Sequence, residues 1–418
     1  MRLVLAAFTV LLSSLLVSGQ TTPASVTVPI TLDHNRIIID ARFPLPDGSM
    51  KRVRCWVDNG NPDMSITEEL ATKLGLPISA EPQAALAAQQ RMTQPPNVIM
   101  IGGMAIHPTA VKEAHAILER EAVGPGLSAE ITLPATVLRD YDVVVDYPNR
   151  ELTIAAAGST HFDGAPVKVF VNSQNGLIQV PSMIAGERYN LALDVGASFG
   201  FVSGELIARW HKAHPEWPEM TGAVGPANMW GLESEPHWEV LRLASLQYGG
   251  TALSNVGVAS FPQDVMAWFE KRAGTETIGL IGANALLEYR VGIDYAHSTV
   301  YLQKTGTPIT TAMDVVGLTL RPEPDERYTV IGVADYEGKP SVPEIKPGDV
   351  LIDIDKVPAK GGTMGQVWSL LSGSPGDERV LTLEREGKQF TVKATVHRFL
   401  ESPSSGETKP APPNPASR

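Results

Sequence analysis

Cysteine is almost absent from this chain of 418 residues, since Cys55 is its single example. One cysteine excludes an intrachain disulfide framework and any cysteine-rich zinc or iron–sulfur site. Basic residues are also in deficit, because 34 Lys and Arg stand against 46 Asp and Glu, a net charge of −12. That balance argues against nucleic acid and anionic membrane surfaces as partners. After the N-terminal segment the chain lacks the apolar run of about 18 residues that a membrane-spanning helix needs.

The two ends of the sequence differ from the rest. Arg2 precedes an apolar run over residues 3–17, which is typical of a signal peptide and short for a membrane-spanning helix. Residues 1–19 are therefore predicted to be a cleaved signal peptide, with an uncleaved anchor as the alternative, and the mature protein is predicted to be periplasmic or secreted. Residues 401–418 are rich in Pro and Ser and are predicted to be a disordered tail.

Between these ends, one β-rich unit occurs twice. Residues 131–147 align with residues 279–295 at an offset of 148 without a gap, and each copy closes with an alternating strand. Further upstream, residues 55–60 align with residues 191–196 in the same order. Short strands and turns dominate both copies, as 37 Gly and 33 Pro favour. The repeat therefore predicts a mainly β fold made of two similar lobes.

Each copy carries an aspartate followed two residues later by a glycine, Asp58 with Gly60 and Asp194 with Gly196. The pattern alone is weak, because roughly two copies are expected by chance and turns favour both residue types. Its position is informative, since both copies follow an apolar strand and precede a hydroxyl-bearing stretch and a short helix, which Thr67 and Ser203 are predicted to cap. If the lobes pack about a pseudo-twofold axis, the two carboxyls converge and share a proton. Such a pair can activate a water molecule.

These residues resemble the retropepsin-like and pepsin-like aspartic peptidases. Residues 194–198, Asp-Val-Gly-Ala-Ser, are similar to the catalytic turn of that family, and residues 280–282 are similar to its second, hydrophobic turn. The resemblance covers about residues 28–304. It implies two β-barrel lobes, at residues 28–157 and 160–304, with Asp58 and Asp194 as the catalytic residues and Gly60 and Gly196 at the substrate.

The sequence departs from the family pattern at Asn59, Val195 and Pro134 and over residues 61–63, where Asn-Pro-Asp replaces the small residues that usually follow the turn. The family has Thr or Ser after each catalytic aspartate, and its hydroxyl bonds across to the opposite lobe; here Asn59 and Val195 stand there. Asn59 can still form hydrogen bonds and Val195 cannot. The second turn of the first lobe has Pro134 where the family has glycine. These departures leave two alternatives, an active peptidase and an inactive protein of the same fold that binds a peptide without cutting it.

A peptidase also needs a segment that covers the substrate and excludes water. Residues 221–231 of the second lobe contain three glycines together with Met229 and Trp230. We expect this segment to be a movable flap with Met229 and Trp230 over the substrate. The alternative is an ordinary long loop.

The C-terminal region, residues 315–398, has a pattern of its own, which predicts short strands and a helix over residues 364–371. Residues 346–355, Lys-Pro-Gly-Asp-Val-Leu-Ile-Asp-Ile-Asp, resemble a signature of bacterial PDZ domains. The resemblance implies a small α+β domain in which the backbone amides of Val316, Gly317 and Leu318 bind the terminal carboxylate of a peptide. The alternative is a small β domain that only packs on the lobes.

The sequence as a whole therefore predicts an exported aspartic endopeptidase with a PDZ-like domain, acting on polypeptides or C-terminal peptides. An inactive peptide-binding protein and a structural envelope protein are the alternatives. No cofactor is expected. No metal site is expected either, because His211 and His214 lack a third ligand at a suitable spacing.

Overall fold

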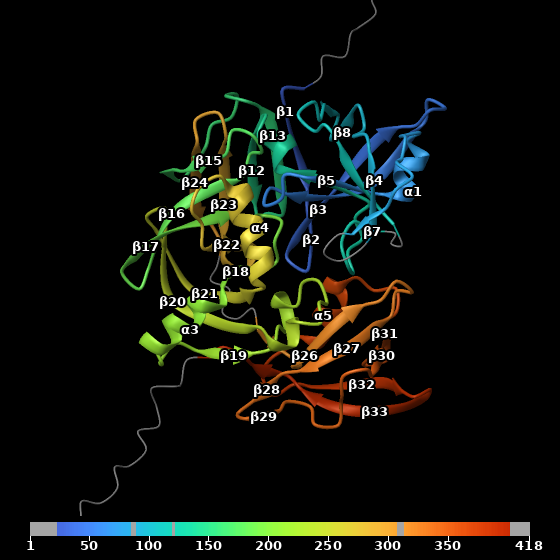
Figure 1. Cartoon of the computed structure of the whole chain (residues 1–418), viewed down its shortest axis with the longest axis vertical. Coiled ribbons are helices and arrows are strands. Elements are labelled where there is room, and N and C mark those ends of the chain that lie inside the picture. Colours follow the sequence, from blue (N-terminus) through green and yellow to red (C-terminus); the bar gives the residue numbers. More distant parts are fainter. Residues whose placement is uncertain (1–22, 85–88, 119–121, 307–312, 402–418) are drawn as a thin grey trace, which may run out of the picture.

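The computed structural model describes residues 23–84, 89–118, 122–306 and 313–401. The predicted signal peptide and almost all of the predicted tail lie outside this range. The described residues are mainly β, as predicted. In Figure 1 the first lobe (blue to cyan) and the second lobe (green to yellow) lie side by side, and the C-terminal domain (orange to red) lies against both. Within the described residues, no helix is both long and apolar enough to cross a bilayer.

One sheet joins the two lobes. Its strands run in the order β1 (Ser25–Pro29), β13 (Glu151–Ala156), β12 (Tyr141–Asp146), β23 (Tyr289–Asp294), β24 (Thr299–Lys304) and β14 (Ala165–Lys168). At its centre β12 pairs antiparallel with β23, and Val144 faces Gly292. These two residues are also equivalent at the repeat offset of 148. The pseudo-twofold axis that relates the lobes therefore passes between them.

Each lobe adds a sheet of its own. In the first lobe the order is β6 (Gln83–Ala84), β7 (Gln89–Thr93), β10 (Ala114–Ile117), β5 (Met64–Thr67), β11 (Ile131–Pro134), β4 (Met50–Asp58), β3 (Arg36–Pro44), β8 (Ile99–Ile101) and β9 (Met104–Ile106), with β2 (Thr31–Asp33) beside β3. In the second lobe it is β15 (Phe170–Val171), β16 (Ile178–Ile184), β17 (Glu187–Leu193), β22 (Gly279–Ile281), β18 (Gly200–Ser203), β21 (Thr251–Phe261), β20 (Glu239–Tyr248) and β19 (Glu219–Thr221). One hydrophobic core runs through both lobes.

The helices are short and follow strands. Helix α1 (Glu68–Lys73) is capped by the side chain of Thr67, and α3 (Gly204–Ala213) is capped by Ser203, at the positions that the sequence predicts. The first lobe also holds α2 (Ala135–Leu138), and the second lobe holds the single turns η1 (Gly225–Ala227), η2 (Glu235–His237) and η3 (Ala283–Ala285). Helix α4 (Gln263–Ala273) was not predicted, although Pro262 precedes it and Gly274 ends it in the left-handed conformation.

The C-terminal domain has a sheet with the order β26 (Leu318–Pro322), β27 (Tyr328–Val333), β30 (Val350–Ile354), β32 (Glu378–Arg385) and β33 (Lys388–Thr395), with β31 (Val357–Pro358) beside β30. Two short pairs flank it, β25 (Asp314–Val315) with β34 (His397–Arg398) and β28 (Asp335–Tyr336) with β29 (Lys339–Pro340). Helix α5 (Met364–Leu371) spans the residues that the sequence predicts. The core of this domain continues into the second lobe, where Ala227 and Met229 pack with Leu318 and Leu320.

Candidate active site

Asp58 and Asp194 lie at the ends of equivalent strands, one in each lobe. Strand β4 ends at Asp58, and β11 runs parallel to it with Pro134 opposite Asp58. In the second lobe β17 ends one residue before Asp194, and β22 runs parallel to it with Ile281 opposite Leu193. Each aspartate therefore leaves a buried strand at the same place in its lobe.

The two loops meet at the boundary between the lobes. A side-chain Cβ on Gly60 would lie 2.0 Å from Oδ2 of Asp194, and one on Gly196 would lie 2.8 Å from Oδ1 of Asp58. Each glycine thus packs against the aspartate of the opposite lobe, which explains why neither position has room for a side chain. The structure brings together the four residues that the repeat singled out, and we refer to Asp58 and Asp194 as the carboxyl pair.

Backbone amides hold one oxygen of each carboxyl. The Gly60 amide donates to Oδ1 of Asp58 at 3.1 Å, and the amides of Gly196 and Ala197 donate to Oδ1 of Asp194 at 2.8 and 2.9 Å. Both carboxyls are buried, and this burial raises the pKa of each above its usual range. The charge of Asp194 raises the pKa of Asp58 further. The surroundings therefore favour a protonated carboxyl in the pair at mildly acidic pH.

Asn59 links the first lobe to the loop of the second. Its Nδ2 donates to the Leu193 carbonyl at 3.0 Å, and its Oδ1 accepts from the Val195 amide at 2.7 Å. One side chain thus holds the backbone on both sides of Asp194. The side chain of Val195 is buried and makes no such bond in return. The cross-lobe link is one-sided, as the difference between an amide and an isopropyl group predicts.

Two aromatic residues of the first lobe support the same loop. Trp56 donates from Nε1 to the Gly196 carbonyl at 3.1 Å. The Tyr147 hydroxyl donates to the Val195 carbonyl at 3.3 Å. The loop around Asp194 is therefore positioned by three side chains from the opposite lobe.

A cleft with a volume of about 660 Å³ opens over the carboxyl pair. We call it the central cleft. Helix α4 forms part of its wall with Met266, Trp268 and Phe269, and the first lobe contributes Trp56 and Ile117. Asp63 of the first lobe and Arg272 of α4 also line the central cleft and form an ion pair of 2.5 Å across the lobes. The mostly apolar wall suits a ligand with bulky apolar groups.

Residues 221–231, which the sequence predicts to be a movable flap, are packed differently in the structure. Met229 and Trp230 do line the central cleft. The 221–231 segment, however, is packed between the second lobe and the C-terminal domain, and Met229 is only 1% exposed. Asn228 fixes it, because this side chain donates to the Leu320 carbonyl and accepts from the Leu320 amide, at 3.0 and 2.9 Å. The segment is therefore a buried wall of the cleft in this structure and not a free flap.

The predicted carboxylate loop of the C-terminal domain is also different. Val316, Gly317 and Leu318 are buried, and the Val316 amide donates to the Leu371 carbonyl at 3.0 Å. The Leu318 amide donates to the Val316 carbonyl at 2.8 Å. Two of the three amides expected to bind a carboxylate are thus used inside the domain. None of the three is among the described residues that line the central cleft.

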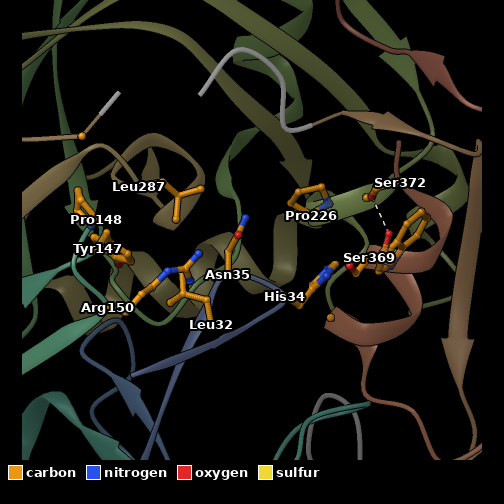
Figure 2. A pocket seen from close by; sticks show the side chains of 14 residues that line it. Leu32, His34, Asn35, Tyr147, Pro148, Arg150, Pro226, Leu287, Ser369 and Ser372 are labelled. Atoms are coloured by element: carbon orange, nitrogen blue, oxygen red, sulfur yellow. Dashed lines mark hydrogen bonds between the residues drawn. The ribbon is translucent and has the colours of Figure 1, made fainter. Parts of the chain in front are cut away.

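A second hollow lies where the two lobes and the C-terminal domain meet, with a volume of about 440 Å³. Figure 2 shows its labelled side chains, with Leu32 and Arg150 on one wall and Ser369 and Ser372 of the C-terminal domain on another. Neither aspartate of the carboxyl pair is among the described residues that line it. This hollow and the central cleft share no lining residue within the described chain, so the two are separate.

Sequence reasoning missed three features of the site. Helix α4 lines the central cleft, and its only sequence signal was Pro262 before it and Gly274 after it. Arg36 and Glu235 are fully buried next to the site, and a charged residue at the start of a strand or turn usually faces solvent.

In the described part of the chain, no group of three or more His, Cys, Asp or Glu is arranged to hold a metal ion.

No family model matches the chain, and neither does any curated protein. Among solved structures, the chain is similar to an aspartic proteinase from Irpex lacteus. The TM-score is 0.43 and the sequence identity is 12%, over 68% of this chain and 98% of that one. A likeness of this size carries no functional argument. A functional assignment therefore has to depend on the geometry of the carboxyl pair.

Proposed function

We propose that this chain is an aspartic endopeptidase in which Asp58 and Asp194 activate a water molecule. One observation supports the proposal above all others. Two buried carboxyls reach the lobe boundary on equivalent loops, each packed against the glycine of the other, under a cleft of about 660 Å³. Buried like-charged groups this close favour a shared proton.

The mechanism follows from that shared proton. The ionised carboxyl of the pair accepts a proton from water while the oxygen of that water attacks the carbonyl carbon of a peptide bond. The protonated carboxyl donates its proton to the carbonyl oxygen, which gives a neutral tetrahedral intermediate. The carboxyl that took the water proton then gives it to the amide nitrogen, and the carbon–nitrogen bond breaks. A hydroxyl of the intermediate returns a proton to the other carboxyl, so the pair is again singly protonated. Because the two carboxyls titrate as a unit, neither has a role fixed before the substrate binds.

The test is the substitution Asp194→Asn. Asparagine is nearly isosteric and cannot share the proton, so turnover of a denatured protein substrate should fall by several orders of magnitude while binding persists. Asp47→Asn is the matched control, because Asp47 is an exposed residue in the turn between β3 and β4. Absence of cleavage by the unsubstituted protein at every pH from about 3 to 8 would refute the proposal.

The inactive peptide-binding protein is the second candidate. The observation in its favour is the one-sided link between the lobes, since Val195 supplies no hydroxyl to the opposite loop. Under this alternative the unsubstituted protein and the Asp194→Asn variant bind a peptide equally well, and neither cleaves it.

We further propose that the protein is exported, on the strength of the apolar run at residues 3–17. For the C-terminal domain we propose a supporting role at the central cleft in place of free peptide capture. The bonds between Asn228 and Leu320 support this role, because Met229 and Trp230 follow directly after Asn228.

A further inference from the structure

Arg36 is a completely buried arginine beside the carboxyl pair. It is the first residue of β3 and has an exposed fraction of 0%. It is not among the described residues that line the central cleft. Its Nη2 donates to the Met229 carbonyl, and neither Nε nor Nη1 has a hydrogen-bond partner within the described residues. A buried cation with two unused donors is costly, so its position calls for an electrostatic explanation.

Trp56 connects Arg36 to both catalytic loops. The guanidinium carbon of Arg36 lies 5.5 Å from the centre of the Trp56 ring. Trp56 precedes Asp58 by two residues and donates to the carbonyl of Gly196 on the opposite loop. The positive charge therefore lies against a side chain that precedes one loop of the pair and hydrogen-bonds the other. Burial raises the pKa of both carboxyls, and the charge of Arg36 lowers the pKa of both.

The charge of the pair explains the need for a cation. Two carboxyls that share one proton carry a single negative charge, and an isolated charge in a buried site is expensive. One fixed positive charge at Arg36 offsets it. Burial lowers the pKa of Arg36 to about 10, so the guanidinium stays charged wherever an acidic or neutral pH applies.

Other titratable groups also face Arg36, from each element that packs on it. They are Asp33 of β2, His34 of the following turn, Glu235 of η2 and Tyr328 of β27. Asp33 already accepts hydrogen bonds from the Thr363 hydroxyl and the Gly365 amide, at 2.8 and 2.9 Å. Burial lowers the pKa of His34 to about 3 and raises that of Glu235 to about 7. In mildly acidic solution His34 and Glu235 are therefore mostly neutral, so neither adds a full charge beside Arg36.

We propose that Arg36 is a positioning residue for the carboxyl pair, a fixed counter-charge that keeps Asp58 and Asp194 in the singly protonated, monoanionic state. Its catalytic meaning rests on the proposed function. Its effect on the titration of the pair does not, because that effect follows from charge and burial alone.

The experiment compares the titration of the pair in the unsubstituted protein with that in Arg36→Met and Arg36→Lys. The carboxyl carbons of aspartate are followed by ¹³C NMR in the full chain, with Asp58→Asn and Asp194→Asn spectra to assign the signals. Methionine removes the charge at similar length, and both titration steps of the pair should then rise by about one pH unit or more. Lysine keeps the charge, and the steps should stay near those of the unsubstituted protein.

Two results would overturn the proposal. One is a pair in Arg36→Met that titrates as in the unsubstituted protein, and the other is an equal shift in the methionine and lysine variants. Circular dichroism reports whether each variant folds, and Arg36→Gln replaces Arg36→Met if the latter does not. If neither neutral variant folds, Arg36→Met is combined with Asp58→Asn and Asp194→Asn, which leave the pair without charge. Folding of this triple variant supports the counter-charge, and a triple variant that does not fold contradicts it.

Activity separates this inference from the proposed function. A shifted titration in Arg36→Met without peptide cleavage by any form supports Arg36 as counter-charge and refutes the peptidase. Cleavage by the unsubstituted protein together with an unshifted titration refutes the role of Arg36 alone. Where both hold, the pH optimum of kcat/KM moves upward in Arg36→Met and not in Arg36→Lys.

Discussion

Asn59 shows how a single side chain can replace a hydroxyl that the family pattern leads one to expect. A hydroxyl has one donor and can also accept, and an amide provides both functions on separate atoms. Asn59 uses Nδ2 for the Leu193 carbonyl and Oδ1 for the Val195 amide. Both backbone groups are buried, so each needs a partner.

Replacing Asn59 with leucine should therefore destabilise the lobe boundary. The variant leaves the Leu193 carbonyl and the Val195 amide without partners, and the free energy of unfolding should fall by roughly 2–4 kcal/mol. Urea unfolding of the two proteins measures the difference. Asn97→Leu is the control, because Asn97 is exposed on the surface. If the two variants unfold at the same urea concentration, the link across the lobes has no energetic role.

The carboxyl pair also predicts how stability depends on pH. Burial raises the pKa of Asp58 and Asp194 in the folded protein, and the charge of Asp194 raises that of Asp58 further. The folded state thus binds protons that an unfolded chain releases near pH 4. This contribution to stability is fully present below the unfolded pKa and is lost as the pH rises through the raised, folded values.

We therefore expect the protein to lose stability between about pH 5 and pH 8, and Asp58→Asn to lose less over the same interval. The asparagine removes one titrating group and also the charge that repels Asp194. Urea midpoints at the two pH values give the comparison. A decrease in Asp58→Asn as large as in the unsubstituted protein would mean that the pair does not cause it.

At the scale of elements, the repeat in the sequence predicted the positions of the strands well. Alternation and the offset of 148 placed β12 and β23 correctly, because their residues have to repeat the same buried pattern on both sides of the axis. Thr67 and Ser203 predicted helix starts, since cap chemistry is local. Helix α4 lies within the second copy and has no side-chain cap, and the proline before it and the glycine after it are equally typical of turns between strands.

The placement of the central cleft could be predicted only in part. The convergence of Asp58 and Asp194 follows from the symmetry of the repeat. The burial of Arg36 and the packing of the 221–231 segment depend instead on contacts with the C-terminal domain. Pairings between residues as distant as Asn228 and Leu320 have no periodic signal in the sequence.

Helix α4 should affect substrate binding more than catalysis. Trp268 lines the central cleft, is 44% exposed, and carries the Arg272 guanidinium 4.3 Å from its ring centre. If the chain is a peptidase, Trp268→Ala should raise KM by about tenfold and leave kcat nearly unchanged, because the lost contact is the same in ground and transition states.

Phe170→Ala is the matched control for Trp268→Ala. Phe170 lies on β15, is equally exposed, and is not among the described residues that line the central cleft. Steady-state kinetics on one peptide give both parameters. A fall in kcat with an unchanged KM would place Trp268 in the chemical step and contradict the prediction.

The C-terminal domain and the second lobe share one hydrophobic core. They are also joined by the hydrogen bonds between Asn228 and Leu320. Strand β26 is an edge strand, and an exposed edge offers free amides and carbonyls to any passing chain. Here the edge is covered at Leu320 by Asn228, whose amide group imitates the backbone of a neighbouring strand. A peptide that adds to β26 has to displace this side chain first.

Asn228→Ala should therefore change what the intact chain can bind. Alanine leaves both backbone groups of Leu320 without a partner, which costs about 1–3 kcal/mol for each buried group. A peptide strand that pairs with β26 recovers part of that cost, so the variant should bind extended peptides at least tenfold more tightly than the unsubstituted protein. Fluorescence anisotropy with a labelled peptide measures the affinity.

Amidation of the peptide tests the mode of that binding. Because the amides of Val316 and Leu318 are used within the domain, peptides with a free and with an amidated C-terminus should bind Asn228→Ala with similar affinity. Asn149→Ala is the control, since Asn149 bonds Asp146 in the first lobe, away from β26. Equal affinity of the unsubstituted protein and of Asn228→Ala for the peptide would show that Asn228 does not prevent a peptide from pairing with β26. Tighter binding of the peptide with a free C-terminus to Asn228→Ala would instead mean that the loop at Val316 opens when the bonds between residue 228 and Leu320 are lost. A charged carboxylate binds only to amides that have lost their internal partners.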